Sequence, residues 1–435
     1  MDTVPERQAR GPTHHRQEST NRPRKKKNSL NPLQKGIRDF ITTDLPPSAL
    51  SEHGLSPETL PSALPKRFTI YEPMLLLSPN ALTAPPEWGA LYAALDAQQR
   101  QTLHASIVRT FRSMGVTHLA INAPIASTDD YGEENRMRSP GGLVPLHGDF
   151  GVDPRQQDTA APGPSDFQNA RWVRTVQNKG IVQVWAPVYT MFSRGNITEK
   201  ARILGQQGWF EGLDGESLGN QDMGDVAVVD MYAGIGYFVF SYLRRGVRRV
   251  WGWEINGWSV EGLRRGCLEN GWGCRVVKVD SEGQVDGSVS GLVGSLDDSV
   301  RAVIFHGDNS HAAAVLGAIR QCMDSQGTWN SVRHVNLGLL PTSSPAWDNA
   351  CRMVDPQKGG WVHVHENVDI RQIEQKREEI VTLLGALWRR TQGHRAPAEP
   401  VVACRHVEHV KTYAPGVMHC VFDVQLLFKG MEHGR

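Results

Sequence analysis

Apolar and polar positions follow a strand-and-helix rhythm over the C-terminal two-thirds of the chain. Most of the apolar runs are separated by stretches in which apolar residues recur at helical spacing. Strands that alternate with helices predict a largely parallel sheet. We therefore expect one α/β domain over residues 166–435, with strands at residues 226–231, 249–254, 275–279, 302–306, 334–340, 361–367 and 418–427.

The pattern upstream predicts a smaller α/β unit over residues 66–165. Residues 67–77 and 116–125 are strand-like, and residues 87–115 have helical spacing and end at a glycine. Residues 126–165 are rich in Asp, Pro, Gly and Ser and are expected to be mainly loop. Residues 1–65 have little apolar periodicity and are expected to form a disordered tail. The Gly/Ser/Asp-rich residues 281–299 are expected to be a surface insertion.

Charge and cysteine content change this picture only at the N-terminus. The whole chain has a net charge of +1, but residues 1–40 contain ten Lys and Arg against four Asp and Glu. This basic tail is either a solvated segment, a nuclear signal or an arm that binds nucleic acid.

Six cysteines without any Cys-x-x-Cys pair favour a reducing compartment and argue against a zinc module. No apolar run is long enough to predict a membrane span or a signal peptide, so we expect a cytoplasmic protein, with a nuclear fraction as the alternative.

The first apolar strand of the large domain ends in a small-residue turn, "DMYAGIG" at residues 230–236. Such a turn lies at the carboxyl edge of a parallel sheet, where ligands bind. Glu254 follows Gly234 by twenty residues and ends the next strand, where a carboxylate can accept hydrogen bonds from ribose hydroxyls. Asp308 and Asn309 end a later strand and can read the edge of adenine. With Asp230 before the turn and no diphosphate cradle, this pattern predicts an adenosine site of the S-adenosylmethionine kind.

Six stretches together resemble the tRNA wybutosine-synthesizing protein 2 family, relatives of the guanosine methyltransferases that act beside the anticodon. The similarity covers residues from about 169 to 427, and "MFSRGNITEK" and "NLGLLPTS" are its most specific parts. The stretches are "QVWAPVYTMFSRGNITEKARI", "DMYAGIGYF", "WGWEINGWSVEGLRRGCLENG", "HVNLGLLPTSSPAWDNACRM", "GGWVHVHENV" and "VKTYAPGVMHCVFDV".

The resemblance implies a class I methyltransferase-like, Rossmann-like α/β fold with a mostly parallel seven-stranded sheet that binds S-adenosylmethionine as a substrate. It also implies transfer of the 3-amino-3-carboxypropyl group to carbon 7 of the tricyclic base 4-demethylwyosine in phenylalanine tRNA, which releases methylthioadenosine. Ser193 and Lys200 then match ligand-contacting positions, Glu254 the ribose acid, and Asp308 with Asn309 the adenine end. A structural alternative for the first two is a helix N-terminus capped by Asn196 and Glu199.

Further candidates follow from residue type and position. Asn336 could bond a base edge and Pro341 stiffens the same loop, but no carboxylate lies between residues 336 and 344 to act as a general base. His363 and His365 share a strand face next to Glu366, although their spacing matches no zinc motif and no metal is expected. The remaining candidates are tryptophans for stacking or packing, Trp253, Trp258 and Trp272, and arginines for tRNA contact, Arg67, Arg109, Arg112, Arg171 and Arg174.

Two other functions remain open from the sequence. A methyltransferase acting on tRNA would use the same fold and substrate but release S-adenosylhomocysteine. A non-catalytic tRNA-binding subunit would keep the fold alone, and the intact "MFSRGNITEK", Glu254 and Asp308 disfavour it.

Overall fold

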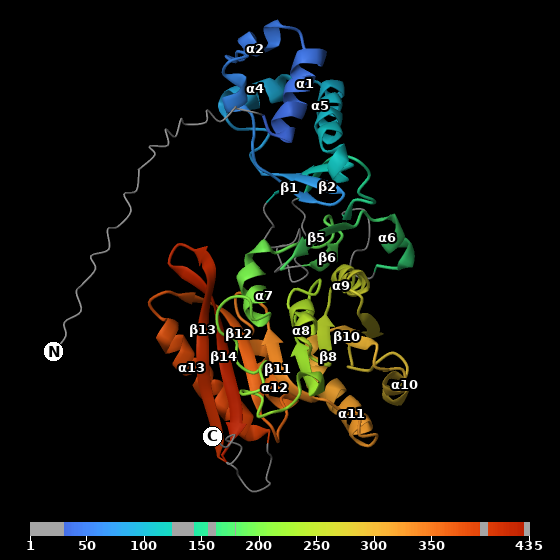
Figure 1. The fold of residues 1–435 in the computed structure, drawn as a ribbon, viewed down its shortest axis with the longest axis vertical. Coiled ribbons are helices and arrows are strands. Elements are labelled where there is room, and N and C mark those ends of the chain that lie inside the picture. The colour runs from blue at the N-terminus through green and yellow to red at the C-terminus, as the bar shows by residue number, and fades with distance from the viewer. Residues whose placement is uncertain (1–29, 124–142, 155–161, 179, 392–398, 430–435) are drawn as a thin grey trace, which may run out of the picture.

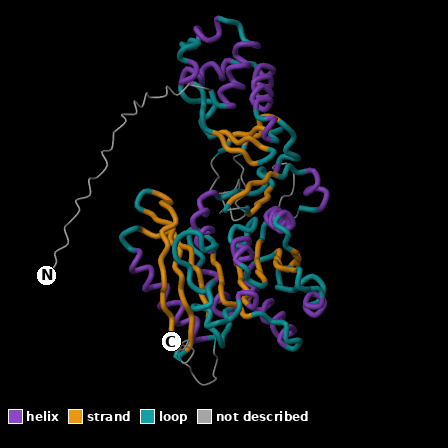
Figure 2. The backbone as a smooth tube through the Cα atoms, viewed as in Figure 1, coloured by secondary structure: helices purple, strands orange, loops and turns teal. Residues whose placement is uncertain are grey.

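The computed structural model describes residues 30–123, 143–154, 162–178, 180–391 and 399–429. A small N-terminal unit (blue to cyan in Figure 1) is followed by a green β-hairpin and then by a larger domain built on one central sheet. Figure 2 shows that helices dominate the far end of the N-terminal unit, whereas long strands run through the larger domain.

The expectation of a disordered tail through residue 65 is wrong for residues 30–65. Helix α1 (Pro32–Asp44) starts with a capping box, in which Asn31 and Gln34 each bond the backbone N–H of the other. Leu33, Ile37 and Phe40 are buried on its inner face. The apolar spacing that buries this helix against the unit outweighs the polar composition around it. Two short helices follow, α2 (Ser48–Glu52) and α3 (Leu60–Ala63), and residues 1–29 lie outside the described residues.

The rest of the N-terminal unit is α/β, as predicted. The helical stretch is divided into α4 (Pro86–Ala94) and α5 (Ala97–Thr110) because Asp96 and Gln99 form a second capping box. Its four strands form one sheet in the order β1-β2-β3-β4. They are β1 (Phe68–Tyr71), β2 (Met74–Leu77), β3 (His118–Ile121) and β4 (Val144–His147).

A connecting region leads into the large domain. Helix α6 (Pro164–Asn169) precedes an antiparallel hairpin of β5 (Val173–Gln177) and β6 (Ile181–Trp185), and α7 (Ile197–Ile203) follows it.

The large sheet confirms the predicted class I methyltransferase-like α/β architecture. In the described residues it has eight strands in the order β13-β14-β12-β11-β7-β8-β10-β9, and the six from β12 to β9 are mutually parallel. Seven match the predicted strands: β7 (Val226–Asp230), β8 (Arg249–Glu254), β9 (Gly273–Lys278), β10 (Val300–His306), β11 (Ser331–Leu337), β12 (Gly360–Asp369) and β14 (Val417–Phe428).

The eighth strand, β13 (Pro400–Ala414), is absent from the prediction of seven. It is an edge strand paired only with β14, and its register shifts at three places. Bulges and a half-exposed edge position break the alternation that reveals a strand in sequence.

Helices on both sides of the sheet complete the core. Residues 281–299 include α10 (Val289–Gly294), whose Leu292 and Val293 are buried in the domain core, so this segment is packed as well as exposed. The other helices are α8 (Val239–Arg245), α9 (Gly257–Glu269), α11 (Ala312–Asp324), α12 (Trp347–Met353) and α13 (Ile373–Arg390). Short 3-10 turns are η1 (Arg112–Met114), η3 (Arg194–Asn196), η4 (Met223–Asp225), η5 (Asn309–His311) and η6 (Ser344–Ala346).

Candidate functional site

The turn after β7 is tied to the ends of its neighbouring strands. The Met231 N–H donates to the Asn336 carbonyl oxygen on β11 (3.0 Å), and the Ala233 N–H donates to the Trp253 carbonyl oxygen on β8 (2.9 Å). Gly234 and Gly236 both have positive φ, at 54° and 88°. A Cβ on Gly236 would lie 2.5 Å from the Phe240 ring, so only glycine fits there. The turn is therefore held at the carboxyl edge in one shape.

Glu254 and Asn309 hold this turn from the other side. Glu254 accepts hydrogen bonds from the N–H groups of Gly234 and Asn256, each at 2.8 Å. The Asn309 amide donates to the Met231 carbonyl oxygen at 2.7 Å. Asp308 is exposed beside it and caps the following 3-10 turn through the Ser310 N–H. The predicted ribose acid and adenine-end pair thus lie around the glycine turn, with Asn309 occupied in holding it.

Asp230 and Asn336 form a buried pair beneath the turn. They are register partners on adjacent parallel strands, and the Asn336 amide donates to Asp230 Oδ1 at 3.4 Å. Burial raises the pKa of Asp230 to about 7. Asp230 Oδ2 and Asn336 Oδ1 are both buried without a hydrogen-bond partner among the described residues. Asn336 is fully buried, so its position does not support the expectation that it bonds a base edge from the loop. Pro341 lies farther along the same loop, where its carbonyl oxygen accepts from the Asn367 N–H.

The "MFSRGNITEK" segment lies against the same turn. Tyr237, which follows the glycine turn, accepts a hydrogen bond from the Ser193 N–H at 3.0 Å and donates to the Met191 carbonyl oxygen at 2.6 Å. Lys200 is buried, and its ammonium lies 5.2 Å from the centre of the Tyr237 ring and 5.5 Å from the centre of the Phe192 ring. The structure therefore brings Ser193 and Lys200 to the glycine turn.

Lys200 has unusual partners for a buried cation. Its ammonium donates to the side-chain oxygens of Gln183 (2.8 Å) and Gln177 (3.2 Å), and no described carboxylate forms a salt bridge with it. Burial lowers the pKa of Lys200 to about 7. The predicted capping box at Asn196 and Glu199 does not form, because Asn196 makes no capping bond and Glu199 is turned to Arg202.

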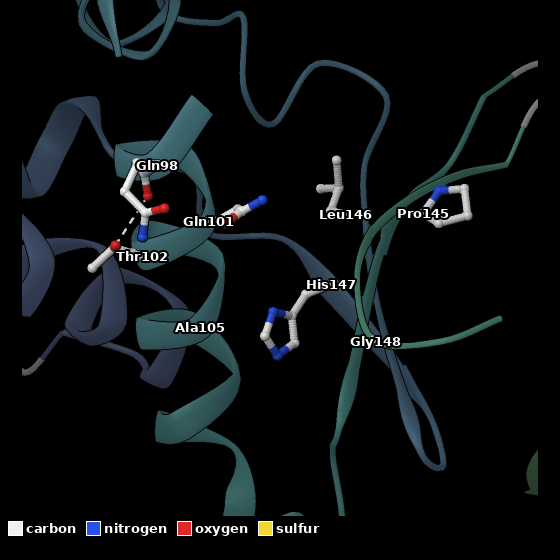
Figure 3. Close-up of a pocket in the computed structure, with 8 residues that line it drawn as sticks. All are labelled: Gln98, Gln101, Thr102, Ala105, Pro145, Leu146, His147 and Gly148. Carbon is white, nitrogen blue, oxygen red and sulfur yellow. Dashed lines mark hydrogen bonds between the residues drawn. The ribbon is translucent and has the colours of Figure 1, made fainter. Parts of the chain in front are cut away.

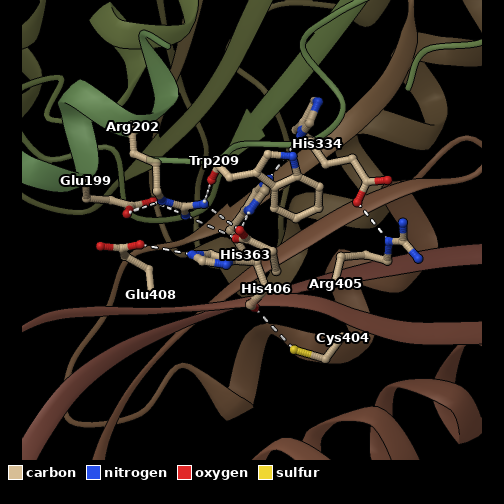
Figure 4. A network of polar contacts seen from close by, with 11 residues as sticks. Glu199, Arg202, Trp209, His334, His363, Cys404, Arg405, His406 and Glu408 are labelled. Carbon is tan, nitrogen blue, oxygen red and sulfur yellow. Dashed lines mark hydrogen bonds and ion pairs between the residues drawn. The ribbon is translucent and has the colours of Figure 1, made fainter. Parts of the chain in front are cut away.

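Sequence reasoning missed a buried polar network that anchors α7 to the sheet (Figure 4). Arg202 forms bidentate bonds with Glu199 on its own helix and with Asp423 on β14. His363 Nδ1 lies 2.6 Å from Asp423, and His363 Nε2 lies 2.9 Å from His334. Burial alone would raise the pKa of Asp423, but His363 and Arg202 hold it below its ordinary value. The only local signal was an Arg three residues after a Glu in a segment expected to start a helix.

The other candidates take structural positions. His365 contacts His419 rather than sharing a cluster with His363 and Glu366, and no group of His, Cys, Asp or Glu in the described residues is arranged to hold a metal ion. Trp253 is in the core, Trp258 stacks on Tyr189 with ring centres 3.7 Å apart, and Trp272 packs on Phe240.

The N-terminal unit and its junction carry the arginines proposed for tRNA contact. Arg67, Arg109, Arg112 and Arg174 are exposed and Arg171 is half-buried. A cavity of about 570 Å³ lies between α5 and β4 and is lined by Gln98, Thr102 and His147 among others (Figure 3). It lies in the N-terminal unit, apart from the carboxyl edge of the large sheet. None of the described helices is long and apolar enough to cross a membrane.

Four features define an α/β protein of the class I methyltransferase type. They are the sheet order, the glycine turn after β7, the acid that ends β8 and the acid–amide pair that follows β10. No protein-family model matches the chain. Two curated relatives are more informative. The chain is 37% identical to tRNA wybutosine-synthesizing protein 2 of Schizosaccharomyces pombe over 366 residues, covering 83% of this chain and 73% of the relative. It is 31% identical to the Saccharomyces cerevisiae protein of that name over 418 residues, covering 88% and 80%. The chain belongs to the tRNA wybutosine-synthesizing protein 2 family.

Solved structures with similar folds are more distant. TYW2 from Pyrococcus horikoshii in complex with MeSAdo is 17% identical, with a TM-score of 0.48, and the match covers 91% of this chain and all of that one. TYW2 from M. jannaschii in complex with AdoMet is 13% identical, with a TM-score of 0.42, covering 83% and 99%.

Proposed function

We propose that this protein transfers the 3-amino-3-carboxypropyl group of S-adenosylmethionine to carbon 7 of 4-demethylwyosine in phenylalanine tRNA. The bond between sulfur and the γ-carbon of the arm breaks, and its electron pair stays on sulfur as methylthioadenosine leaves. A new bond joins that γ-carbon to carbon 7, which gives up its proton to an acceptor. Family membership and the layout of the carboxyl edge support the proposal.

The observation that carries the proposal is the glycine turn held between β8, β10 and β11, together with the polar side chains around it. S-adenosylmethionine carries a sulfonium, an ammonium and a carboxylate, and these side chains suit each of the three groups. Asp230 Oδ2 and Asn336 Oδ1 are buried acceptors without partners in the described residues, and they suit an ammonium or a sulfonium. Lys200 donates to two neutral amides and to no carboxylate among the described residues, so it suits the carboxylate of the arm. Glu254 and Asp308 lie at the strand ends that suit ribose and adenine.

These groups orient a substrate rather than react with it. A sulfonium has three carbons open to displacement, and the one that reacts is the one held in line with the nucleophile at about 3–3.5 Å. Groups that bind both ends of the amino-acid arm can present its γ-carbon in place of the methyl carbon. The choice of transferred group is then a matter of orientation.

The test is incubation with hypomodified phenylalanine tRNA and S-adenosylmethionine, followed by mass spectrometry of the released nucleoside. Methylthioadenosine is expected, whereas S-adenosylhomocysteine would show a methyltransferase instead. Phenylalanine tRNA that lacks the tricyclic base is the control and should release neither. We also propose a cytoplasmic location, which the six unpaired cysteines support and which imaging of a tagged chain would check.

A further inference from the structure

Three polar side chains form a row across the end of the sheet that the proposed S-adenosylmethionine site does not use. Asn367 on β12 is the register partner of His419 on β14, and His419 is the register partner of Lys411 on β13. Direct register partners have side chains on the same face of a sheet. We call Asn367, His419 and Lys411 the polar row.

The polar row lies between two segments of the candidate site. The Asn367 N–H donates to the carbonyl oxygen of Pro341 in the "NLGLLPTS" loop at 2.9 Å. On the other side, Lys411 lies directly against Gly195 in the turn that leads into α7, since a Cβ on that glycine would be 2.1 Å from the Lys411 ammonium. The row is thus bounded by the proposed substrate loop and by the segment that carries Ser193.

Several polar atoms of the row are shielded from solvent and have no partner in the described part of the chain. They are both side-chain atoms of the Asn367 amide and Nδ1 of His419, together with Nε2 of the adjoining His365. His365 and His419 bond each other through Nδ1 and Nε2 at 3.1 Å, so one of their two remaining ring nitrogens is a donor and the other an acceptor. Buried polar groups left unpaired are costly, and a row of them at the carboxyl edge indicates a ligand with a mixed donor and acceptor edge.

The charges along the row limit the kind of ligand that it can bind. Burial, and then the nearby Lys411, lowers the pKa of His419 to about 4, so its ring is neutral near pH 7. Lys411 is exposed and forms no salt bridge with a described carboxylate. The row therefore offers a neutral hydrogen-bonding surface with one cation at its outer end. A heterocyclic base attached to a phosphate backbone has this combination of an uncharged edge and an anion.

The strand order separates the row from the adenosine end. Neighbouring strands lie about 4.8 Å apart, so β14 is about 14 Å from β7 and about 19 Å from β8. Glu254 ends β8 and Asp308 follows β10, on the opposite side of the β7–β11 junction. A molecule held by its adenosine at β8 and by its arm at β7 leaves β12, β14 and β13 for the second substrate.

We propose that the polar row receives the nucleotide that is modified, with the amide of Asn367 on the base edge and the ammonium of Lys411 on its phosphate. This inference rests on the proposed function, since it assigns the RNA half of that same site. The assignment also places the reacting carbon over the junction of β7 and β11, between the S-adenosylmethionine half of the site and the polar row.

The test uses the full chain and three variants, Asn367→Leu, Lys411→Ala and the control Lys429→Ala. Lys429 also carries an exposed ammonium on this hairpin, but it pairs with Glu399 at the other end of the sheet. Thermal unfolding, S-adenosylmethionine affinity by calorimetry, tRNA affinity at several salt concentrations and single-turnover release of methylthioadenosine are measured for each.

Asn367→Leu is expected to leave the melting temperature unchanged or higher, because the amide it removes has no partner among the described residues. Its single-turnover rate should fall by about tenfold or more, the size of a lost hydrogen bond to a buried polar group, with S-adenosylmethionine affinity unchanged. Lys411→Ala should weaken tRNA binding and reduce the slope of log K against log salt by about 0.7–0.9, whereas Lys429→Ala should not.

Three results would overturn the proposal. A lower melting temperature for Asn367→Leu would make the amide structural. A loss of S-adenosylmethionine affinity with unchanged tRNA binding would assign the row to the arm carboxylate. Unchanged tRNA affinity and rate in both variants would leave the row without a ligand. If the wild-type chain binds tRNA but releases no methylthioadenosine, the proposed function fails, and the salt slopes and tRNA affinities of the variants still decide the role of the row.

Discussion

Replacing Arg202 with methionine tests whether the buried network holds helix α7 in place. All five guanidinium N–H groups of Arg202 are used, by Glu199, Asp423 and the carbonyl oxygen of Trp209. The side chain is only 1% exposed, so water cannot replace these bonds. Methionine keeps much of the length and apolar volume but leaves two buried carboxylates without their cation.

The expected loss of stability is large because the residual charges stay buried. Removing one partner of a buried ion pair costs about 3–5 kcal/mol. At about 2–4 °C per kcal/mol for a domain of this size, the melting temperature should fall by roughly 6–20 °C. Removing all three charges together, as Glu199→Leu, Arg202→Met and Asp423→Leu, should recover most of this loss, since no unpaired charge then remains.

The assay is thermal and denaturant unfolding of the wild type, the single variant, the triple variant and the control Glu399→Gln. Glu399 pairs with Lys429 at the surface, where water screens the pair, so this control should change stability little. Burial already raises the pKa of Glu199 above its ordinary value, and Arg202 is the main group that opposes this rise. Without Arg202 the charged form of Glu199 is penalised further, so the deficit of Arg202→Met should shrink as pH falls from 7 toward 5. The reasoning is refuted if Arg202→Met unfolds within about 1 kcal/mol of the wild type, or if the triple variant is less stable than the single one.

The other predictions concern single side chains. Burial lowers the pKa of Lys200 to about 7, far below its unfolded value, so the unfolded chain binds more protons above pH 7 and stability should rise with pH. Lys200→Met should remove this rise, of up to about 1.4 kcal/mol per pH unit, in denaturant midpoints from pH 7 to 9. Glu254→Ala should weaken S-adenosylmethionine binding without unfolding the chain, and equal affinity by calorimetry would count against a ribose role. Phe40→Ala should cost about 3–5 kcal/mol in urea unfolding, because α1 is part of the fold.

The sequence was most informative where burial and local chemistry coincide. Strand β8 spans residues 249–254 as predicted, because its middle residues 250–253 form a continuous run without polar side chains, typical of a strand buried on both faces. Asp230, Gly234, Glu254 and Asn309 could be brought together from sequence because parallel strands place their carboxyl ends at one edge. Asn31 and Gln34 have the spacing of a capping box and indicate the start of helix α1. The prediction missed this helix because the polar composition of the segment before it favoured disorder.

What could not be predicted depends on contacts between distant segments. Arg202 and Asp423 are 221 residues apart, and nothing near Asp423 distinguishes it from an exposed acid on a strand. Asn336 was expected to face a base because it opens the "NLGLLPTS" loop, yet its place within β11 puts it under the glycine turn. Strand β13 is visible only through its pairing with β14.

The position of Asn336 bears on how one fold can serve two different transfers. Asp230 and Asn336 are register partners across the β7–β11 junction, and each has one side-chain oxygen there without a hydrogen-bond partner in the part of the chain that the structure describes. From this junction, Glu254 and Asp308 lie toward β8 and β10, and the polar row lies toward β12 and β13. A substrate that enters between the two halves has its sulfonium near the junction whichever carbon is transferred. The proposed function therefore assigns the choice of product to the side chains that would fix the arm, Lys200 above all, and to those that would fix the angle of the incoming base.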